Sequence, residues 1–399
     1  MLKYLLHSAK VINLFILIAL ILPLSVSAKN KLDSQYANWE RNLSTKPHEV
    51  LSALNQSFSK VQGDPYLLAQ HHFLYSATYT ALTFPDKALE HADKALALIP
   101  QSDYPWFYHK IIVAKVIALD FVGDPQQALP LINRAIDWAT RNNNKWLLVE
   151  ALSARGHIYN ALSFSINALN DFQKAYNMVP EKGGEINQGD IANDIALVYE
   201  YRNENKLSVP FFEQAVAHYR EQNNFLELSV VLYGLGRANY KLGHLETGQQ
   251  QLKESARLAR KVKDFQGEAY ALKELAGLAF KKGDSAQAIQ MLQTTYQTFI
   301  ESNNKFMLID TSFSLSRIYL SEGKIKLAEQ YLAQAYNYLD AEAMPLQSLA
   351  INELNAKILA YKGEYQQAYE KLLDTTSRKQ KIYSNNKGYC CKSRTSFRI

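Results

Sequence analysis

Small residues recur at a fixed interval of 40 positions along this chain. Apolar residues stand four positions after most of them, and a further small residue stands seven positions after each. Spacings of three, four and seven place side chains on one face of a helix. A constant period of this size is typical of proteins built from repeated helical units. The eight marker residues are Ala88, Ala128, Ala168, Ser208, Gly248, Ala288, Ala328 and Ala368.

Each 40-residue unit also has an upstream half. A mostly small residue stands twelve positions before every marker, and Gly, Asn, Ser or Thr stands five positions before it. Gly and Asn tolerate left-handed backbone and end helices, while Asp and Pro, as in Gly123-Asp124-Pro125, begin them. The pattern therefore predicts two helices per unit. We expect an all-α fold, an α-solenoid of about eight antiparallel helix pairs over residues 64–376.

Polar turns between the units support this count. Asn144, Asn224, Asp264 and Asn304 each lie sixteen positions after a marker, within runs such as Arg141-Asn142-Asn143-Asn144. Such clusters favour turns and helix ends.

The unit resembles the tetratricopeptide repeat. The shared pattern is small-x-x-Tyr-x-x-x-Gly-x-x-x-x-Ala-x-x-x-Phe-x-x-Ala, with Pro100 and Pro180 closing two units. The usual repeat has 34 residues, so the six extra positions imply longer helices or turns. This variant resembles repeats of bacterial regulatory and sensor proteins. Because the fifth unit has Asn239 and Gly248 where Tyr and Ala are usual, we expect looser packing there.

The N-terminus has the order of a secretory signal. Lys3 and Lys10 precede an apolar run over 11–22, and small residues end at Ala28. We predict a signal peptide over residues 1–28, cut after Ala28, which implies an exported, periplasmic protein. The alternative is an uncleaved anchor that holds the protein in the inner membrane facing the periplasm. Residues 29–63 are expected to form an N-terminal helical cap or an atypical repeat.

The C-terminus departs from the repeat pattern. Residues 377–399 contain seven Lys or Arg and no acid, and we predict a basic, poorly ordered tail there. Residues 368–384 resemble the connector that follows the repeats in membrane-bound bacterial sensors with a diguanylate cyclase or kinase domain. That resemblance implies the periplasmic sensory half of a truncated signalling protein, with a missing C-terminal region. A natural basic tail is the alternative.

The charge balance changes once both ends are set aside. The formal net charge is +6, but two of the 44 basic residues lie in 1–28 and seven in 377–399. The remaining 35 basic residues face 38 acidic ones. A slightly acidic body is a poor match to DNA or RNA, so we expect no nucleic-acid partner. Contact with a membrane is expected only through an uncleaved signal or a missing C-terminal region.

Motifs that carry catalysis are not found. The two cysteines, Cys390 and Cys391, are adjacent, and the nine histidines lack the His-Glu-x-x-His spacing of zinc proteases. His71 and His72 point about 100° apart on a helix and are expected to be a surface pair. We therefore predict no enzyme activity, no cofactor and no metal site.

A binding surface is expected where first helices line the concave face, as the resemblance implies. The C-terminal half offers cations and aromatic residues, and the middle offers Glu150, Asp190, Asp194 and Glu200. Such a groove suits an extended peptide or a charged partner, although long cations on helices are often a solvated face. The candidate residues are Asn160, Asn193, Tyr233, Arg237, Lys273, Phe313, Arg317 and Lys357.

Three classes of function follow. The first is an exported module that binds a peptide or protein in its groove, free or as the sensory half of a signalling protein. The second is a structural adaptor in bacterial envelope assembly. The third is an enzyme with an unrecognised site. Only Asn160, Asn193 and Lys273 match the set with which some family members hold a C-terminal carboxylate, so binding of that kind is not predicted.

Overall fold

Helices make up every regular element of the described chain. The computed structural model describes residues 29–43, 46–181, 188–341 and 344–395. The predicted signal peptide, residues 1–28, lies outside these ranges. The all-α fold class predicted from the sequence is confirmed.

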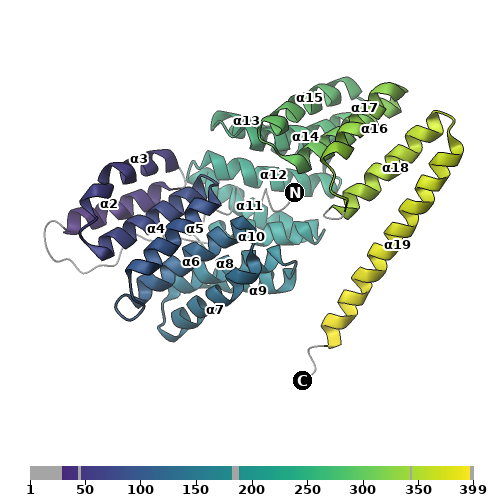
Figure 1. The fold of residues 1–399 in the computed structure, drawn as a ribbon. Coiled ribbons are helices and arrows are strands. Elements are labelled where there is room, and N and C mark those ends of the chain that lie inside the picture. The colour runs from purple at the N-terminus through teal and green to yellow at the C-terminus, as the bar shows by residue number, and fades with distance from the viewer. Residues whose placement is uncertain (1–28, 44–45, 182–187, 342–343, 396–399) are drawn as a thin grey trace. The chain divides into compact units, whose positions relative to one another are not determined.

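Two helices and a short 3-10 turn precede the repeats, and eight helix pairs follow among the described residues. The pairs are α4 with α5, α6 with α7, and so on to α18 with α19 (Figure 1). The elements are α2 Lys29–Asn42, α3 Pro47–Ser57, η1 Phe58–Lys60, α4 Pro65–Ala81, α5 Pro85–Leu98, α6 Pro105–Val122, α7 Pro125–Arg141, α8 Lys145–Ala161, α9 Ser165–Met178, α10 Gln188–Tyr201, α11 Asn205–Glu221, α12 Phe225–Lys241, α13 Leu245–Lys261, α14 Phe265–Lys281, α15 Ser285–Glu301, α16 Lys305–Ser321, α17 Ile325–Tyr338, α18 Pro345–Tyr361 and α19 Tyr365–Thr395.

The 40-residue period is visible in the helix boundaries. Second helices begin at intervals of 40 residues from Pro85 to Tyr365. In α12 to α15, four helices of 17 residues alternate with turns of three residues. The six positions beyond the usual repeat length are therefore taken up by long helices joined by tight turns.

A left-handed residue ends the first helix of every pair. All eight residues five positions before the markers have a positive φ, between 61° and 90°. Five are glycine, for which this conformation carries no Cβ penalty. They are Thr83, Gly123, Ser163, Asn203, Gly243, Gly283, Gly323 and Gly363.

Side chains cap the helices that follow the polar turns. The Asn144, Asn224, Asp264 and Asn304 side chains each accept a hydrogen bond from the backbone N–H three residues further on, over 2.9–3.3 Å. Such a bond satisfies one of the amide groups that a helix start leaves unpaired. The turns predicted from polar clusters are therefore the starts of α8, α12, α14 and α16.

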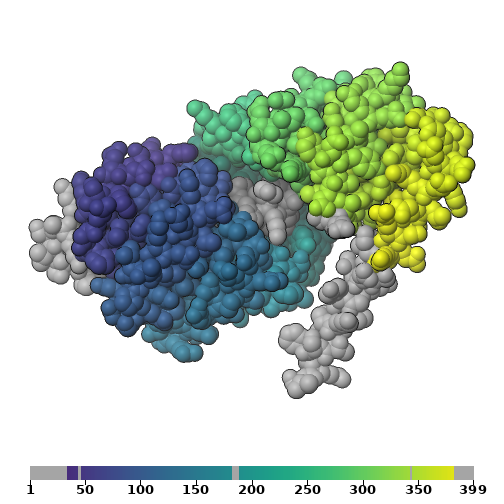
Figure 2. All heavy atoms as spheres, viewed as in Figure 1, coloured from purple at the N-terminus to yellow at the C-terminus, as the bar shows by residue number. Residues whose placement is uncertain are grey.

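The chain consists of two compact units, and the boundary between them falls inside α13. The N-terminal unit covers residues 2–251 and the C-terminal unit residues 252–399. Figure 2 shows the described side chains of α2 to α8, purple to blue, as one closely packed surface. Each unit has its own apolar core, which includes Ile132 and Phe172 in the first and Leu292 and Leu332 in the second.

The fifth repeat is closely packed, contrary to the looser packing expected from its sequence. A Cβ built on Gly248 would lie 2.7 Å from the carbonyl oxygen of Gly236 and 3.0 Å from the backbone nitrogen of Tyr240. The side chain of Asn239 is also satisfied, because its Nδ2 donates to Gln251 Oε1 over 2.9 Å. Glycine therefore stands at this marker position because the backbones of α12 and α13 approach too closely for a methyl group.

The last helix differs from its counterparts in two ways. Helix α19 continues to Thr395, whereas the sequence predicts a poorly ordered tail from residue 377. Leu372 is 44% exposed, although the residues at its repeat position in the seven earlier units are all buried, as Leu332 is at 3%. The difference follows from position, because no further repeat among the described residues covers this face of α19. In the described part of the chain, no helix has both the length and the apolarity needed to cross a membrane.

Candidate partner-binding surface

The first helices of successive repeats form a layer of their own. In the N-terminal unit α4 contacts α6, α6 contacts α8, and α10 contacts α12. In the C-terminal unit α14 contacts α16, and α16 contacts α18. We call these helices the first-helix layer. Helix α6 buries twelve of its 18 residues whereas its partner α7 buries five of 17, so the layer is the more enclosed one.

Two predicted site residues in this layer are buried amides. Asn193 of α10 is 1% exposed, and neither its Nδ2 nor its Oδ1 has a hydrogen-bond partner among the described residues. Asn160 of α8 is 8% exposed, and within the same ranges its Oδ1 is likewise unpaired. Buried polar groups are normally paired, and an unpaired one costs about 1–3 kcal/mol. These two amides are therefore candidates for pairing with a bound partner.

Carboxylates predicted for the middle of the groove pair with histidines of other helices. Asp190 of α10 lies 2.6 Å from Nε2 of His218 on α11. Asp194, one helical turn further along α10, lies 3.4 Å from Nε2 of His157 on α8. Asn193 therefore sits on α10 between two carboxylates that already have partners.

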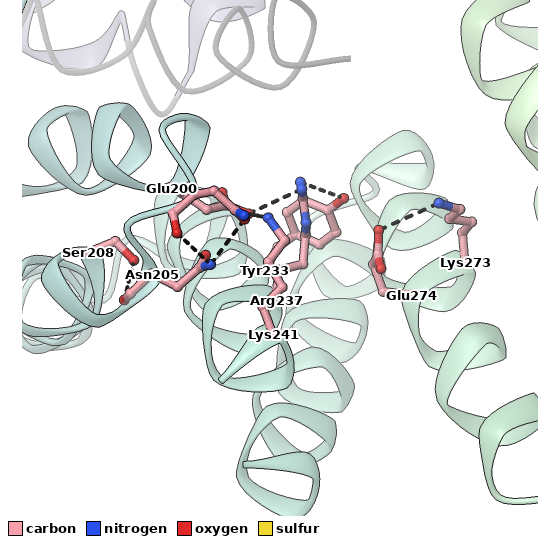
Figure 3. Close-up of polar contacts among 9 residues, drawn as sticks. Glu200, Asn205, Ser208, Tyr233, Arg237, Lys241, Lys273 and Glu274 are labelled. Atoms are coloured by element: carbon pink, nitrogen blue, oxygen red, sulfur yellow. Dashed lines mark hydrogen bonds and ion pairs between the residues drawn. The ribbon is translucent and has the colours of Figure 1, made fainter. Parts of the chain in front are cut away.

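A charged cluster joins the fourth and fifth repeats. Glu200 at the end of α10 has a side chain 1% exposed, and its Oε1 lies 3.1 Å from Arg237 Nη2 and 3.0 Å from Lys241 Nζ. Figure 3 shows both cations of α12 directed at this carboxylate. Arg237 also lies over the ring of Tyr233, 5.2 Å from its centroid, and donates to the Tyr233 hydroxyl over 3.4 Å.

Tyr233 and Arg237, two of the predicted site residues, are therefore in contact, but Arg237 also forms an ion pair with Glu200. Glu200 and Arg237, which the sequence assigns to different parts of the groove, meet here and neutralise each other. An ion pair with a buried carboxylate fixes the orientation of α12 relative to α10.

A second charged cluster ties α2 to the first-helix layer. Lys110 Nζ of α6 lies 2.9 Å from Glu40 Oε1 of α2, and both side chains are buried. Burial lowers the pKa of Lys110, an effect that Glu40 and Glu150 oppose. Burial also raises the pKa of Glu150 on α8 to about 8, against the opposing effect of Lys110. Lys110 therefore forms an ion pair with Glu40 and acts on Glu150 only electrostatically, and Glu150 holds its proton at neutral pH.

The predicted residues of the C-terminal unit have three different environments. Lys273 of α14 is paired with Asp310 of α16 and lies 3.6 Å from Glu274 (Figure 3). Phe313 is half-buried against the core of the unit. Arg317 is exposed and lies over the ring of Phe280, 5.7 Å from its centroid, and Lys357 is exposed on α18.

The two adjacent histidines are buried, so the prediction of a surface pair is wrong. His71 Nδ1 lies 3.1 Å from the Tyr36 hydroxyl of α2, and its Nε2 lies 2.9 Å from the carbonyl oxygen of Leu54 on α3. His72 points the other way, with Nδ1 2.9 Å from Nδ1 of His91 on α5. Helices α2 and α3 cover this face of α4, which the repeat pattern gave no means of foreseeing. In the described ranges, no group of three or more His, Cys, Asp or Glu side chains is placed to hold a metal ion.

Comparison with known proteins identifies the fold. No protein-family model matches the sequence, and no curated protein matches it either. Solved structures do match. The apo form of RapI has a TM-score of 0.62 at 12% identity, over 89% of this chain and 99% of that one. The Rap conjugation gene regulator of plasmid pLS20, in complex with the Phr* peptide, has a TM-score of 0.56 at 14% identity, over 82% and 88%.

A third match carries the repeat's name. The signal transduction ATPase with a tetratricopeptide repeat sensor from Pyrococcus horikoshii has a TM-score of 0.58 at 10% identity, over 81% of this chain and 52% of that chain. At such identities the likeness concerns the fold alone. The chain has the fold of a tetratricopeptide-like helical solenoid, as its repeat pattern predicts.

Proposed function

We propose that this protein is an interaction module that binds a peptide or protein segment on the first-helix layer of its N-terminal unit. The observation that carries the proposal is Asn193, whose buried amide has an unpaired donor and an unpaired acceptor among the described residues. A peptide backbone presents one donor and one acceptor per residue. A single asparagine amide can therefore pair with both the donor and the acceptor of a peptide backbone. Asn160 can pair with a backbone donor through its Oδ1.

The surrounding charges support an extended ligand of low net charge. Asp190, Asp194 and Glu200 already have cationic or histidine partners. Backbone hydrogen bonds would then supply most of the affinity near α8 and α10, and side-chain pockets the specificity. The pLS20 Rap regulator, whose fold is similar, was solved in complex with a peptide, and this supports the choice of a peptide as ligand.

Export belongs to the same proposal. Its support is the charge and apolar order of residues 1–28, with an inner-membrane anchor facing the periplasm as the alternative form. The sensory role within a larger signalling protein has the support of the connector-like residues 368–384. Fusing residues 1–28 to a reporter enzyme that is active only outside the cytoplasm tests export: an inactive reporter contradicts it.

The binding proposal is tested with the full chain and a random peptide library. Peptides selected on the wild-type protein are titrated against Asn193→Ala and against Asn177→Ala, which removes an exposed asparagine of α9. Loss of hydrogen bonds to a buried amide predicts about tenfold weaker binding for Asn193→Ala and no change for Asn177→Ala. Equal affinity of both variants and the wild type removes Asn193 from the site, and failure to select any peptide contradicts the function.

A further inference from the structure

A pocket of about 220 Å³ lies in the N-terminal unit, and none of the residues proposed to bind a peptide lines it. The loop after α5 contributes Gln101, the first half of α6 contributes Tyr108, His109 and Ile112, and the last half of α7 contributes Arg134, Asp137, Trp138 and Arg141. Neither the repeat pattern nor the proposed peptide surface assigns a role to this set of side chains.

His109 carries a hydrogen-bond donor that no other described residue satisfies. The residue is 4% exposed, and its Nε2 lies 3.2 Å from the amide nitrogen of Gln101. An amide nitrogen only donates, so Nε2 accepts and the proton of the neutral ring is on Nδ1. Burial, aided by nearby Arg134, lowers the pKa of His109, which keeps the ring neutral at pH 7. Among the described residues Nδ1 has no hydrogen-bond partner.

Two arginines line the same pocket without an ion pair. Within the described ranges, neither Arg134 nor Arg141 has a carboxylate within salt-bridge distance, although Asp137 lies between them on α7. Arg155 on the neighbouring α8 gives the contrast, because its guanidinium is held by Asp171 over 2.6 Å. Two guanidinium groups against one carboxylate leave the pocket with an excess of donors and of positive charge.

An aromatic wall completes the pocket. The ring of Trp138 stacks on that of His109 with centroids 5.0 Å apart and planes 25° apart. Trp138 and Ile112 therefore offer apolar surface beside the donors. Pockets with apolar walls and a few convergent polar groups are typical of small-molecule sites.

We propose that this pocket binds a small organic carboxylate with a planar apolar group. Its carboxylate oxygens accept hydrogen bonds from Arg134, Arg141 and the Nδ1–H of His109, while the planar group lies against Trp138 and Ile112. Guanidinium groups match the planar geometry of a carboxylate, and the paired donors give these bonds their strength. The site does not depend on the peptide surface of the first-helix layer.

The test uses isothermal titration calorimetry on the full chain with three probes. Benzoate carries the carboxylate and the ring, benzamide is its uncharged counterpart, and inorganic phosphate is an oxyanion without an apolar group. We expect saturable benzoate binding with a dissociation constant of about 1 mM. We expect no benzamide binding, and weaker phosphate binding. Tighter binding of phosphate than of benzoate overturns the carboxylate assignment.

Variants locate the binding. Arg134→Gln combined with Arg141→Gln is expected to weaken benzoate binding at least about tenfold. Lys174→Gln combined with Lys206→Gln removes the same charge from exposed positions and is expected to leave binding unchanged. Asn193→Ala should also leave it unchanged, which separates this site from the peptide surface. The proposal is overturned if the arginine variant binds benzoate as tightly as the wild type. It is also overturned if the wild type shows no binding at a benzoate concentration of about ten times the expected dissociation constant.

Discussion

Two glycine-to-alanine substitutions are expected to have opposite effects on stability. At Gly248 of α13, an added methyl carbon would lie 2.7 Å from the Gly236 carbonyl oxygen and 3.0 Å from the Tyr240 backbone nitrogen. Both atoms belong to the backbone of α12, so neither can move aside without separating the two helices. At Gly277 of α14, no atom lies within 4 Å of the added carbon.

The magnitudes follow from these contacts. Overpacking a closely packed interface costs about 1–3 kcal/mol, and contacts of 2.7 Å and 3.0 Å with backbone atoms place Gly248→Ala in the upper part of that range, at about 2–3 kcal/mol. Replacing glycine by alanine in a helix offsets about 1 kcal/mol of this cost. Gly248→Ala should therefore lower the free energy of unfolding by about 1–2 kcal/mol. Gly277→Ala has only the propensity gain, and should raise the free energy of unfolding by about 0.5–1 kcal/mol.

Urea unfolding followed by circular dichroism ranks the wild type, Gly248→Ala and Gly277→Ala by their free energy of unfolding. Native-state hydrogen exchange then locates the effect, because each repeat of a solenoid contacts only its neighbours. In Gly248→Ala, the protection of backbone amides against hydrogen exchange should fall in α12 and α13, and the helices remote from that contact should keep the protection of the wild type. A Gly248→Ala protein as stable as the wild type would refute the close approach of α12 and α13.

Three further predictions concern burial and pH. Leu332→Ala should destabilise the protein by about 2–5 kcal/mol and Leu372→Ala by under about 1.5 kcal/mol, because Leu332 is 3% exposed and Leu372 is 44% exposed. Equal losses of unfolding free energy in urea would contradict the burial of this position in α17 and its exposure in α19. Burial in the folded state raises the pKa of Glu150 from 4.5 to about 8. Between about pH 4.5 and pH 8 the folded protein therefore keeps a proton on Glu150 that the unfolded chain has released, and the free energy of unfolding should fall as the pH rises through this range. Glu150→Gln should remove that slope and raise the unfolding free energy at pH 8 by on the order of 1 kcal/mol or more, whereas the exposed control Glu213→Gln should leave the slope intact. Asn193→Leu should raise the unfolding free energy by about 1–3 kcal/mol, since it removes two unpaired polar atoms, and should lose peptide binding; a destabilised variant would show that the amide is paired.

The repeat architecture was predictable because it depends on local chemistry. Residues with small side chains, left-handed turn residues and capping asparagines act within a few positions of themselves, and all eight turn residues have the expected positive φ. The packing of Gly248 was predicted wrongly because a glycine marks either a gap or a close approach. Only the position of Gly236 on the facing helix decides between the two.

The charges of the first-helix layer were named but their pairing was missed. His157 with Asp194, Glu200 with Arg237, and Lys273 with Asp310 are each 37 positions apart. This separation is one period less about one helical turn, so it joins a first helix to the next first helix. A search for basic and acidic residues at that spacing would have found these three pairs.

Features that depend on elements outside the repeats had no signal in the period. His71 is buried by α2 and α3, and Lys110 is paired with Glu40 of α2. The donors of Arg134, Arg141 and His109 meet only through the packing of α6 on α7. Sequence patterns place such residues on helix faces but not opposite one another.

Cross-linking of a bound peptide tests the central claim most directly. A library-selected peptide carrying a photoreactive phenylalanine analogue is irradiated with the full wild-type chain, and the attachment sites are found by mass spectrometry. We expect attachment within α8 and α10, near Asn160 and Asn193, and its loss in Asn193→Ala. Attachment confined to the second helices α7, α9 and α11 would contradict it.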